Sequence, residues 1–137
     1  MTTKDLCIGN WVTDYNRIPM LVQAIYDKDT VYLDFDGYEG DTWELDINDV
    51  RPIELTKEII EKIGFKIEEG LIRYNAIMQM GNYMLTINTL SNTEGRVFYL
   101  EVDNEFEGFI GGCDIQYVHE LQNIVRLATG KDLEIKI

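Results

Sequence analysis

A single histidine, His119, limits the nucleophilic chemistry that this chain could carry out. A Ser-His-Asp or Cys-His site needs a base within hydrogen-bond reach of its nucleophile, so any such site would have to use His119. The residue lies beside the apolar positions of a C-terminal helical pattern, where a packed or surface histidine is the simpler interpretation. We therefore expect no catalytic residues and no enzymatic activity. An active site built from carboxylates alone stays open as an alternative.

Metal and cofactor sites are equally poorly represented. Cys7 and Cys113 are the only cysteines; they are too few for a disulfide framework and lack CxxC spacing, so we interpret them as small buried hydrophobes, with a bridge between them as the less favoured alternative. An acidic loop starting at Asp34 resembles a calcium loop in composition, but it has Tyr38 and Glu39 where that motif requires an oxygen donor and a glycine. Phosphate-binding glycine motifs are absent from the sequence. We expect neither a metal nor a cofactor.

The densest chemical signal is acidic. Between Asp27 and Asp49 the sequence holds nine Asp or Glu residues against Lys28 alone, with tyrosines and a tryptophan interleaved. Carboxylates beside exposed aromatic side chains can form a partner surface with electrostatic steering. The simpler alternative is that the aromatic residues fill a small core while the acids coat it. The candidate partner surface, called the acidic–aromatic segment below, consists of Tyr32, Asp34, Asp36, Tyr38, Asp41 and Trp43.

The net charge of −13 over 137 residues bounds the classes of partner. Nucleic-acid affinity comes largely from Lys and Arg that displace counterions, so direct nucleic-acid binding is disfavoured, as is attraction to an anionic membrane. The sequence holds no apolar run long enough to span a membrane and no secretory pattern at its start, so we expect a cytoplasmic protein.

Alternating apolar residues and turn signals predict an α+β fold. Four or five short strands in the first half predict an SH3-like antiparallel barrel or curled sheet over residues 1–52. Residues 53–137 are predicted to form an α+β subdomain packed against it as one unit. This subdomain would contain a helix between Thr56 and Gly64, an antiparallel meander, a helix from Asp114 to Gly130 and a final strand over Leu133–Ile137.

Three segments in fixed order carry a resemblance. They are DLCIGNWV at 5–12, RPIELTKEIIEKIGFK at 51–66 and YVHELQNIVRLATGKDLEI at 117–135. Together they resemble a family of small uncharacterised proteins from Bacteroidales genomes, their prophages and their phages. The resemblance covers nearly the whole chain, with a more divergent centre. It implies an accessory product of a mobile element and supplies no catalytic residues. Cys7 stands where arginine is usual in that family.

These observations predict a small acidic accessory protein of phage or prophage origin that binds a macromolecule, most simply a protein. In the sharper form of this hypothesis it inhibits a nucleic-acid-handling or defence system by acting as an acidic decoy. A nucleic-acid-binding SH3-like module and a carboxylate-based enzyme are the alternatives. An open strand edge near Ile135 would also allow a homodimer.

Overall fold

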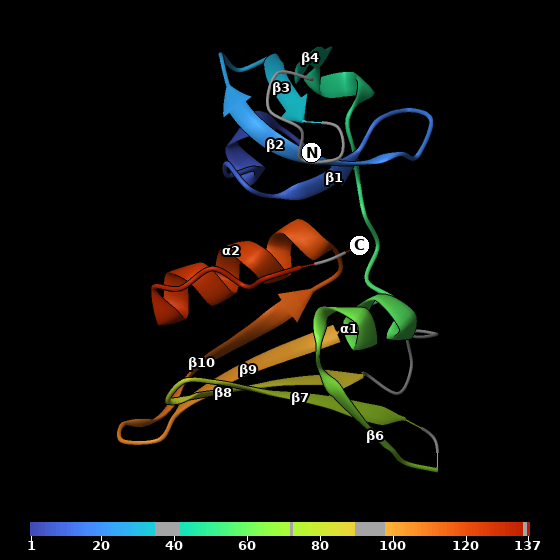
Figure 1. The fold of residues 1–137 in the computed structure, drawn as a ribbon. Coiled ribbons are helices and arrows are strands. Elements are labelled where there is room, and N and C mark those ends of the chain that lie inside the picture. The colour runs from blue at the N-terminus through green and yellow to red at the C-terminus, as the bar shows by residue number, and fades with distance from the viewer. Residues whose placement is uncertain (35–41, 72, 90–97, 136) are drawn as a thin grey trace. The chain divides into compact units, whose positions relative to one another are not determined.

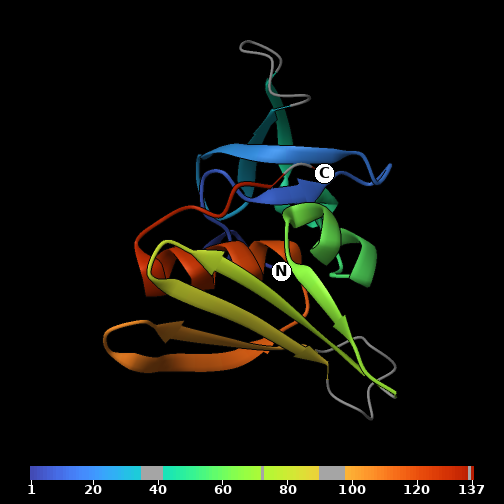
Figure 2. The same ribbon diagram turned by 60° about the horizontal axis from the view of Figure 1, so that its bottom comes forward.

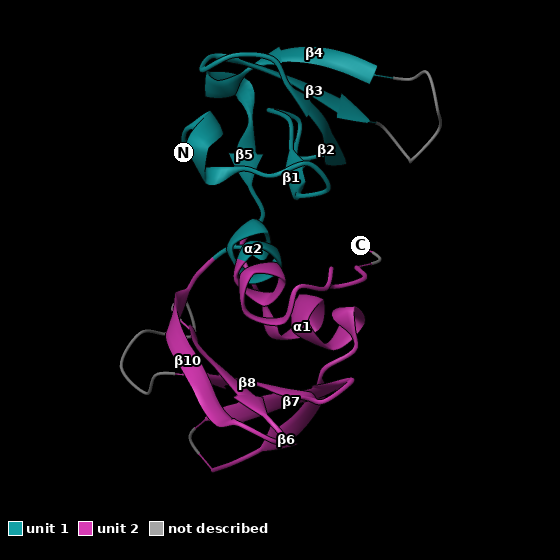
Figure 3. Cartoon of the chain, turned by 90° about the vertical axis from the view of Figure 1, so that its left-hand side faces the viewer, with its two compact units in different colours: residues 1–53, 117–123 teal, residues 54–116, 124–137 magenta. Residues whose placement is uncertain are grey.

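The computed structural model describes residues 1–34, 42–71, 73–89, 98–135 and 137. The chain folds into two compact units, which are coloured separately in Figure 3. Unit 1 comprises residues 1–53 and 117–123, and unit 2 comprises residues 54–116 and 124–137. The last helix is therefore shared, because its first half belongs to unit 1 and its second half to unit 2. Sequence patterns had placed 117–123 entirely with the second subdomain.

Unit 1 is an antiparallel sheet with the strand order β4-β3-β2-β1-β5. The strands are β1 (Trp11–Thr13), β2 (Pro19–Ile25), β3 (Thr30–Asp34), β4 (Thr42–Asp46) and β5 (Arg51–Pro52), with short 3-10 turns at Thr3–Asp5 and Ile47–Asp49. Strands β4 and β5 form the two edges and do not pair with each other, so the described strands form a curled open sheet and not a closed barrel. Its core contains Leu6, Val12, Met20, Val22, Val31, Leu33, Ile47 and Val50.

Unit 2 is a second antiparallel sheet, with the strand order β10-β9-β8-β7-β6. Its elements are α1 (Lys57–Ile63), β6 (Lys66–Glu69), β7 (Tyr74–Met80), β8 (Tyr83–Thr89), β9 (Phe98–Asn104), β10 (Gly108–Ile115) and the second half of α2 (Val118–Thr129). Figures 1 and 2 show α1 and this part of α2 on the same face of the sheet. Buried residues of the covered face include Ala76, Leu85, Ile87, Leu100, Val102 and Ile115. The α+β class predicted from the sequence is confirmed.

Local signals explain helix α1. The Thr56 hydroxyl accepts a hydrogen bond from the Ile59 N–H at 3.2 Å, which satisfies one of the free donors of the first turn. Gly64 ends the helix with φ +116°, a conformation that residues with a Cβ rarely adopt. Ile60 and Ile63 are buried, so the helix is stabilised by packing on the sheet rather than by its two turns alone.

Two predictions for the C-terminal region are wrong. Asp114 does not begin a helix, because it pairs with Tyr99 inside strand β10. Helix α2 begins at Val118, where the Glu120 carboxylate accepts a hydrogen bond from the Tyr117 N–H at 3.0 Å. Residues 133–135 form no strand; Leu133 is buried there without ladder pairing. Neither described helix is long and apolar enough to cross a membrane.

Candidate interaction site

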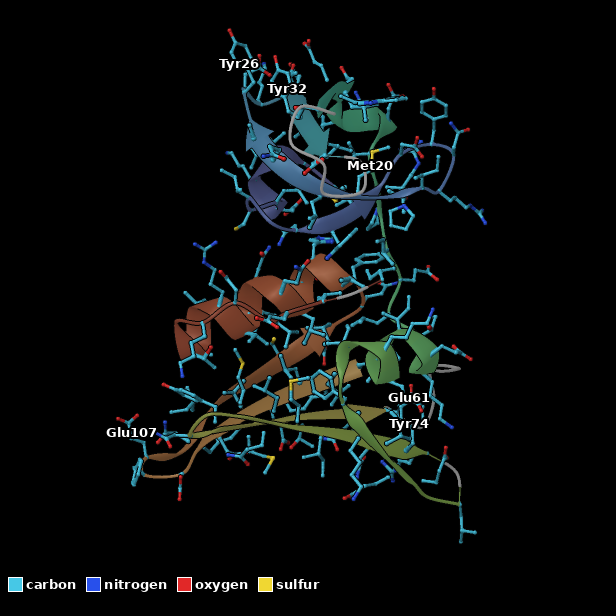
Figure 4. The ribbon with its side chains drawn as sticks, in the orientation of Figure 1. Met20, Tyr26, Tyr32, Glu61, Tyr74 and Glu107 are labelled. Atoms are coloured by element: carbon cyan, nitrogen blue, oxygen red, sulfur yellow. The ribbon has the colours of Figure 1, made fainter. Side chains whose placement is uncertain are left out.

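The acidic–aromatic segment is only partly described. Asp36, Tyr38 and Asp41 lie outside the described residues. Tyr32 is half-buried, and its ring contacts Tyr26 edge-on, with centroids 6.3 Å apart; Figure 4 shows both at the margin of unit 1. Asp34 is 9% exposed, whereas Trp43 on edge strand β4 is 56% exposed.

The register of β3 and β4 separates the two described aromatic side chains of this segment. Tyr32 is opposite Glu44, while Leu33 is opposite Trp43. Directly opposed residues of an antiparallel pair share a face and successive residues alternate, so Tyr32 and Trp43 belong to opposite faces of the sheet. The described part of the segment therefore does not gather its aromatic side chains into one surface.

A hydrogen-bonded joint in unit 1 brings together two segments that the resemblance singled out. The side chain of Gln122 in α2 forms two hydrogen bonds with the backbone of the turn before β1. Its Oε1 accepts from the Trp11 N–H at 2.8 Å, and its Nε2 donates to the Gly9 carbonyl at 3.0 Å. Gly9 adopts φ +93°, which brings both backbone groups toward one amide. One side chain thus fixes the backbone on both sides of Asn10.

Asn123 and Asn10 extend this joint. Asn10 Nδ2 donates to Asn123 Oδ1 at 2.8 Å, and Asn10 Oδ1 accepts from the Cys7 N–H at 2.7 Å. Asn123 Nδ2 in turn donates to the Asp5 carbonyl at 3.1 Å. These amides satisfy one another and nearby backbone groups, as buried polar groups must. The IGNW and LQN segments therefore have a structural reason to occur together, and they do not form an open site.

His119 is packed in unit 1 rather than presented to solvent. It is 4% exposed, and its ring stacks on Tyr117 with centroids 5.7 Å apart and planes inclined by 10°. Burial lowers the pKa of His119 below its usual value, although the carboxylates of Glu120 and Asp5 act in the opposite direction. The Nδ1 atom is buried without a hydrogen-bond partner. Of the two positions expected for this histidine, packed or at the surface, the packed one is found.

Charged clusters in the described ranges offer no metal-binding arrangement. No three His, Cys, Asp or Glu side chains of these residues are grouped to hold a metal ion. Cys7 and Cys113 are not joined by a disulfide, and both are half-buried. On unit 2, Lys57 forms an ion pair with Glu69 and lies 5.3 Å from the Tyr74 ring centre. Burial, reinforced by Glu58 and Glu69, raises the pKa of Tyr74, so this phenol stays protonated at neutral pH.

A polar hollow of about 540 Å³ lies beside the β6–β7 connection. Glu68, Asn75, Asn88 and Tyr99 line it and occupy successive strands in one cross-strand row, through the pairings of β6, β7, β8 and β9. They alternate with residues of the helix-covered face, such as Ala76 and Ile87, and so belong to the opposite, solvated face. Polar side chains are expected there, and this row singles out no ligand.

The unusual surface of unit 2 is apolar. Phe106, Phe109 and Ile110 belong to the β9–β10 hairpin, and Leu127 belongs to α2; Phe106 is 79%, Phe109 61% and Leu127 88% exposed. We call Ile110 and Leu127 the apolar patch, because both line one groove. Phe109 is opposite Asp103, the neighbour of buried Val102 of the helix-covered face, so Phe109 belongs to the other face of the sheet. Two hydrogen bonds order the hairpin turn. Asn104 Oδ1 accepts from the Phe106 N–H at 2.8 Å and from the Glu107 N–H at 3.1 Å. Exposure of Phe106 is therefore a property of an ordered turn.

An apolar groove adjoins the patch. It has a volume of about 270 Å³ and is lined by Leu100, Val102, Ile110, Gly111, Gly112, Cys113, Ile124, Leu127 and Ala128. Its walls come from β9, β10 and the second half of α2, all within unit 2. Grouped exposed apolar side chains beside a concave apolar surface are typical of interaction sites, whereas single ones are ordinary.

The β9–β10 hairpin, which contributes Ile110 to the groove, is acidic in sequence. From Phe98 to Ile115 the chain carries Glu101, Asp103, Glu105, Glu107 and Asp114 but neither Lys nor Arg. Figure 4 shows Glu107 at the end of the hairpin. Sequence reasoning missed this surface because Phe106–Ile110 was interpreted as an ordinary strand. The alternation of Glu and Phe at 105–109 was a signal that could have identified it.

Comparison of the chain with protein-family models, with curated proteins and with solved structures found no match. Functional inference therefore depends on the geometry and chemistry of the two units. Within the described residues, the apolar patch and its groove depart most clearly from an ordinary solvated surface.

Proposed function

We propose that this chain is a small acidic accessory protein that acts by binding another protein through the apolar patch of unit 2. The observation that carries the proposal is the apolar groove between β10 and α2, at which Ile110 and Leu127 are exposed together. Exposed aromatic and large aliphatic side chains are costly to leave in water and supply the central contacts of protein interfaces.

The charge of the chain narrows the class of partner. With a net charge of −13, the protein attracts basic surfaces over several ångströms and repels acidic ones. A nucleic-acid-binding protein presents such a basic surface. The sharper form of the proposal is an inhibitor that occupies that surface as a decoy. Origin in a phage or prophage is part of the same proposal and is supported by the three ordered sequence segments at 5–12, 51–66 and 117–135.

The test uses the tagged full-length chain in affinity capture from a bacterial lysate, with two matched variants. Leu127→Asp places a charge in the apolar patch, and Leu71→Asp makes the same change at another fully exposed leucine of unit 2. We expect a stoichiometric protein partner that Leu127→Asp loses and Leu71→Asp retains.

Three results would contradict this proposal. Equal capture by both variants would remove the apolar patch from the interaction. Capture of no protein at any salt concentration would remove protein binding itself. Recovery of nucleic acid instead, confirmed by a gel shift with purified protein at low salt, would favour the SH3-like nucleic-acid-binding alternative.

A further inference from the structure

Strand β10 is an edge strand of the unit 2 sheet. Among the described strands it pairs with β9 alone. The opposite edge, β6, is charged: it holds Lys66, Glu68 and Glu69, and Glu69 is engaged by Lys57. Charged side chains are a common protection against the addition of a further strand. The part of β10 from Gly108 to Gly112 has no charged residue and no proline, and it includes three glycines.

The same part of β10 forms one wall of the apolar groove. The pairing of β10 with β9 shifts between Phe109 and Gly111, which leaves Ile110 as the extra residue of a bulge. Ile110, Gly111 and Gly112 all line the groove, opposite Leu127 and Ala128 of α2. Because Gly111 has no Cβ and Ala128 has a small side chain, the space between strand and helix stays open. The edge of β10 is thus directly beside the apolar groove, which has room for an apolar side chain.

This combination suits an extended segment. A segment that adds to a sheet edge gains main-chain hydrogen bonds, and alternate side chains then point toward the same side. One of these would enter the groove between β10 and α2. A helical segment could use the groove as well, but it would leave the backbone groups of the β10 edge unused.

The charge of the β9–β10 hairpin predicts which residues flank the apolar side chain of the incoming segment. The hairpin carries five carboxylates and no cation, and Glu105 and Glu107 are outside both ion pairs found among the described residues. Arg126, the nearest cation on α2 in sequence to Leu127, is engaged by Asp132 at 3.5 Å. Lys or Arg on the incoming segment would complement this surface. A second copy of the chain would bring another set of carboxylates, so like-charge repulsion opposes self-association.

We propose that the groove takes an extended segment of a partner protein, which adds as a strand to β10 at Gly108–Gly112, inserts an apolar side chain beside Leu127 and carries flanking Lys or Arg. This inference rests on the protein-binding function proposed above and specifies its recognition mode. The β10 edge and the adjacent groove favour an extended segment with an apolar side chain, and the net charge of −13 favours flanking Lys or Arg.

The first experiment selects short random peptides on the immobilised full-length chain. We expect enriched sequences with a large apolar residue and nearby Lys or Arg. A synthetic copy of the most enriched peptide should bind about tenfold more weakly to Leu127→Asp, while Leu71→Asp binds it normally. The pair Glu105→Lys with Glu107→Lys should weaken it more than Glu58→Lys with Glu61→Lys, which changes the net charge equally on α1.

The second experiment identifies the mode of binding. Hydrogen exchange should slow at the amides of 108–112 when that peptide binds, because strand addition occupies backbone groups of the edge. N-methylation of alternate peptide residues should abolish binding, and methylation of the intervening residues should not, because only every second residue of an added antiparallel strand faces β10.

Distinct outcomes separate the recognition mode from the function. Strand addition would be overturned if peptide binding depends on Leu127 but leaves hydrogen exchange at 108–112 unchanged. It would also be overturned if N-methylation shows no alternation along the peptide. Either result would leave the proposed protein binding in place. Enrichment of acidic peptides would overturn the charge argument. Failure of both peptide selection and lysate capture would overturn the proposed function itself. A concentration-dependent dimer in light scattering that Leu127→Asp abolishes would replace the partner segment by a second copy.

Discussion

Gln122 illustrates how much structure one side chain can organise. Its amide holds the Trp11 N–H and the Gly9 carbonyl, two backbone groups at the entry to strand β1. We expect Gln122→Ala to lower the free energy of unfolding by about 1–3 kcal/mol, because both partners lose a hydrogen bond in a half-buried place. Urea unfolding would measure this loss. Gln23→Ala, at an exposed position of β2, is the control, and equal losses in the two variants would contradict the role given to Gln122.

His119 gives the protein a predictable response to pH. Burial lowers its pKa in the folded state, so the unfolded chain binds a proton more readily. The contribution of neutral His119 to the free energy of unfolding is therefore fully present above the pKa of the unfolded chain, 6.5. It is lost as pH falls from there toward the pKa of the folded state. Glu120 and Asp5, which favour the protonated form, reduce the effect, whereas the N-terminal ammonium adds to it.

The measurement compares unfolding free energies of the wild type and His119→Gln between neutral pH and about pH 5. The carboxylates titrate in both proteins. The difference between the two curves of unfolding free energy against pH therefore reports the contribution of His119 alone. We expect the wild type to lose more stability than the variant over this range. Parallel curves would mean that His119 is as accessible to protons in the folded state as in the unfolded chain.

Sequence reasoning at this scale succeeded where one residue type has few roles. A lone histidine on an apolar stripe was interpreted as structural, and His119 is indeed buried. It failed for the amides, because Asn10 and Asn123 are separated by more than a hundred positions and their partnership depends on the tertiary fold. Asp34 shows the same limit: its side chain is 9% exposed although its acidic neighbourhood suggested a solvated surface.

Elements with strong local signals were predictable. Helix α1 has its N-cap at Thr56 and its left-handed ending at Gly64, both as the sequence indicates. Strand β10 was not, because Gly111–Gly112 is a typical turn signal and Asp114 a typical N-cap. Pairing with β9 overrides both: Gly112 is opposite Glu101, and a Cβ there would lie only 2.7 Å from Tyr99 Cζ. Glycine is needed at this position for close packing and not for a turn.

Gly64 provides a test of an element boundary. Its φ of +116° is unfavourable for any residue with a Cβ, so Gly64→Ala should destabilise the protein by about 1 kcal/mol or more even though the nearest atom, Met78 Cε, is 3.4 Å from the added carbon. Thermal unfolding of Gly64→Ala and Gly111→Ala makes the comparison. Gly111 has no positive φ and no atom within 4 Å of an added Cβ, so its substitution should be tolerated. An equal loss of stability would contradict the backbone explanation.

At the scale of the whole molecule, charge dominates. The chain has 25 acidic and 12 basic residues, yet the described residues contain only two ion pairs, Lys57–Glu69 and Arg126–Asp132, and both are exposed. Exposed pairs contribute little, whereas a large net charge opposes the compact state through self-repulsion. Screening by salt should therefore remove more repulsion than attraction. We expect the thermal unfolding midpoint at neutral pH to rise as sodium chloride is increased from about 0.01 M to about 0.5 M.

The origin of such a rise can be tested with Glu44→Lys combined with Glu54→Lys. Both positions are exposed, and the double substitution reduces the net negative charge without touching either ion pair. If repulsion is the cause, this variant should start with a higher midpoint at low salt and gain less from added chloride. A midpoint that falls with salt in the wild type would show that attractive pairs outweigh repulsion. An equal gain in both proteins would indicate a general effect of the salt on burial of apolar surface instead.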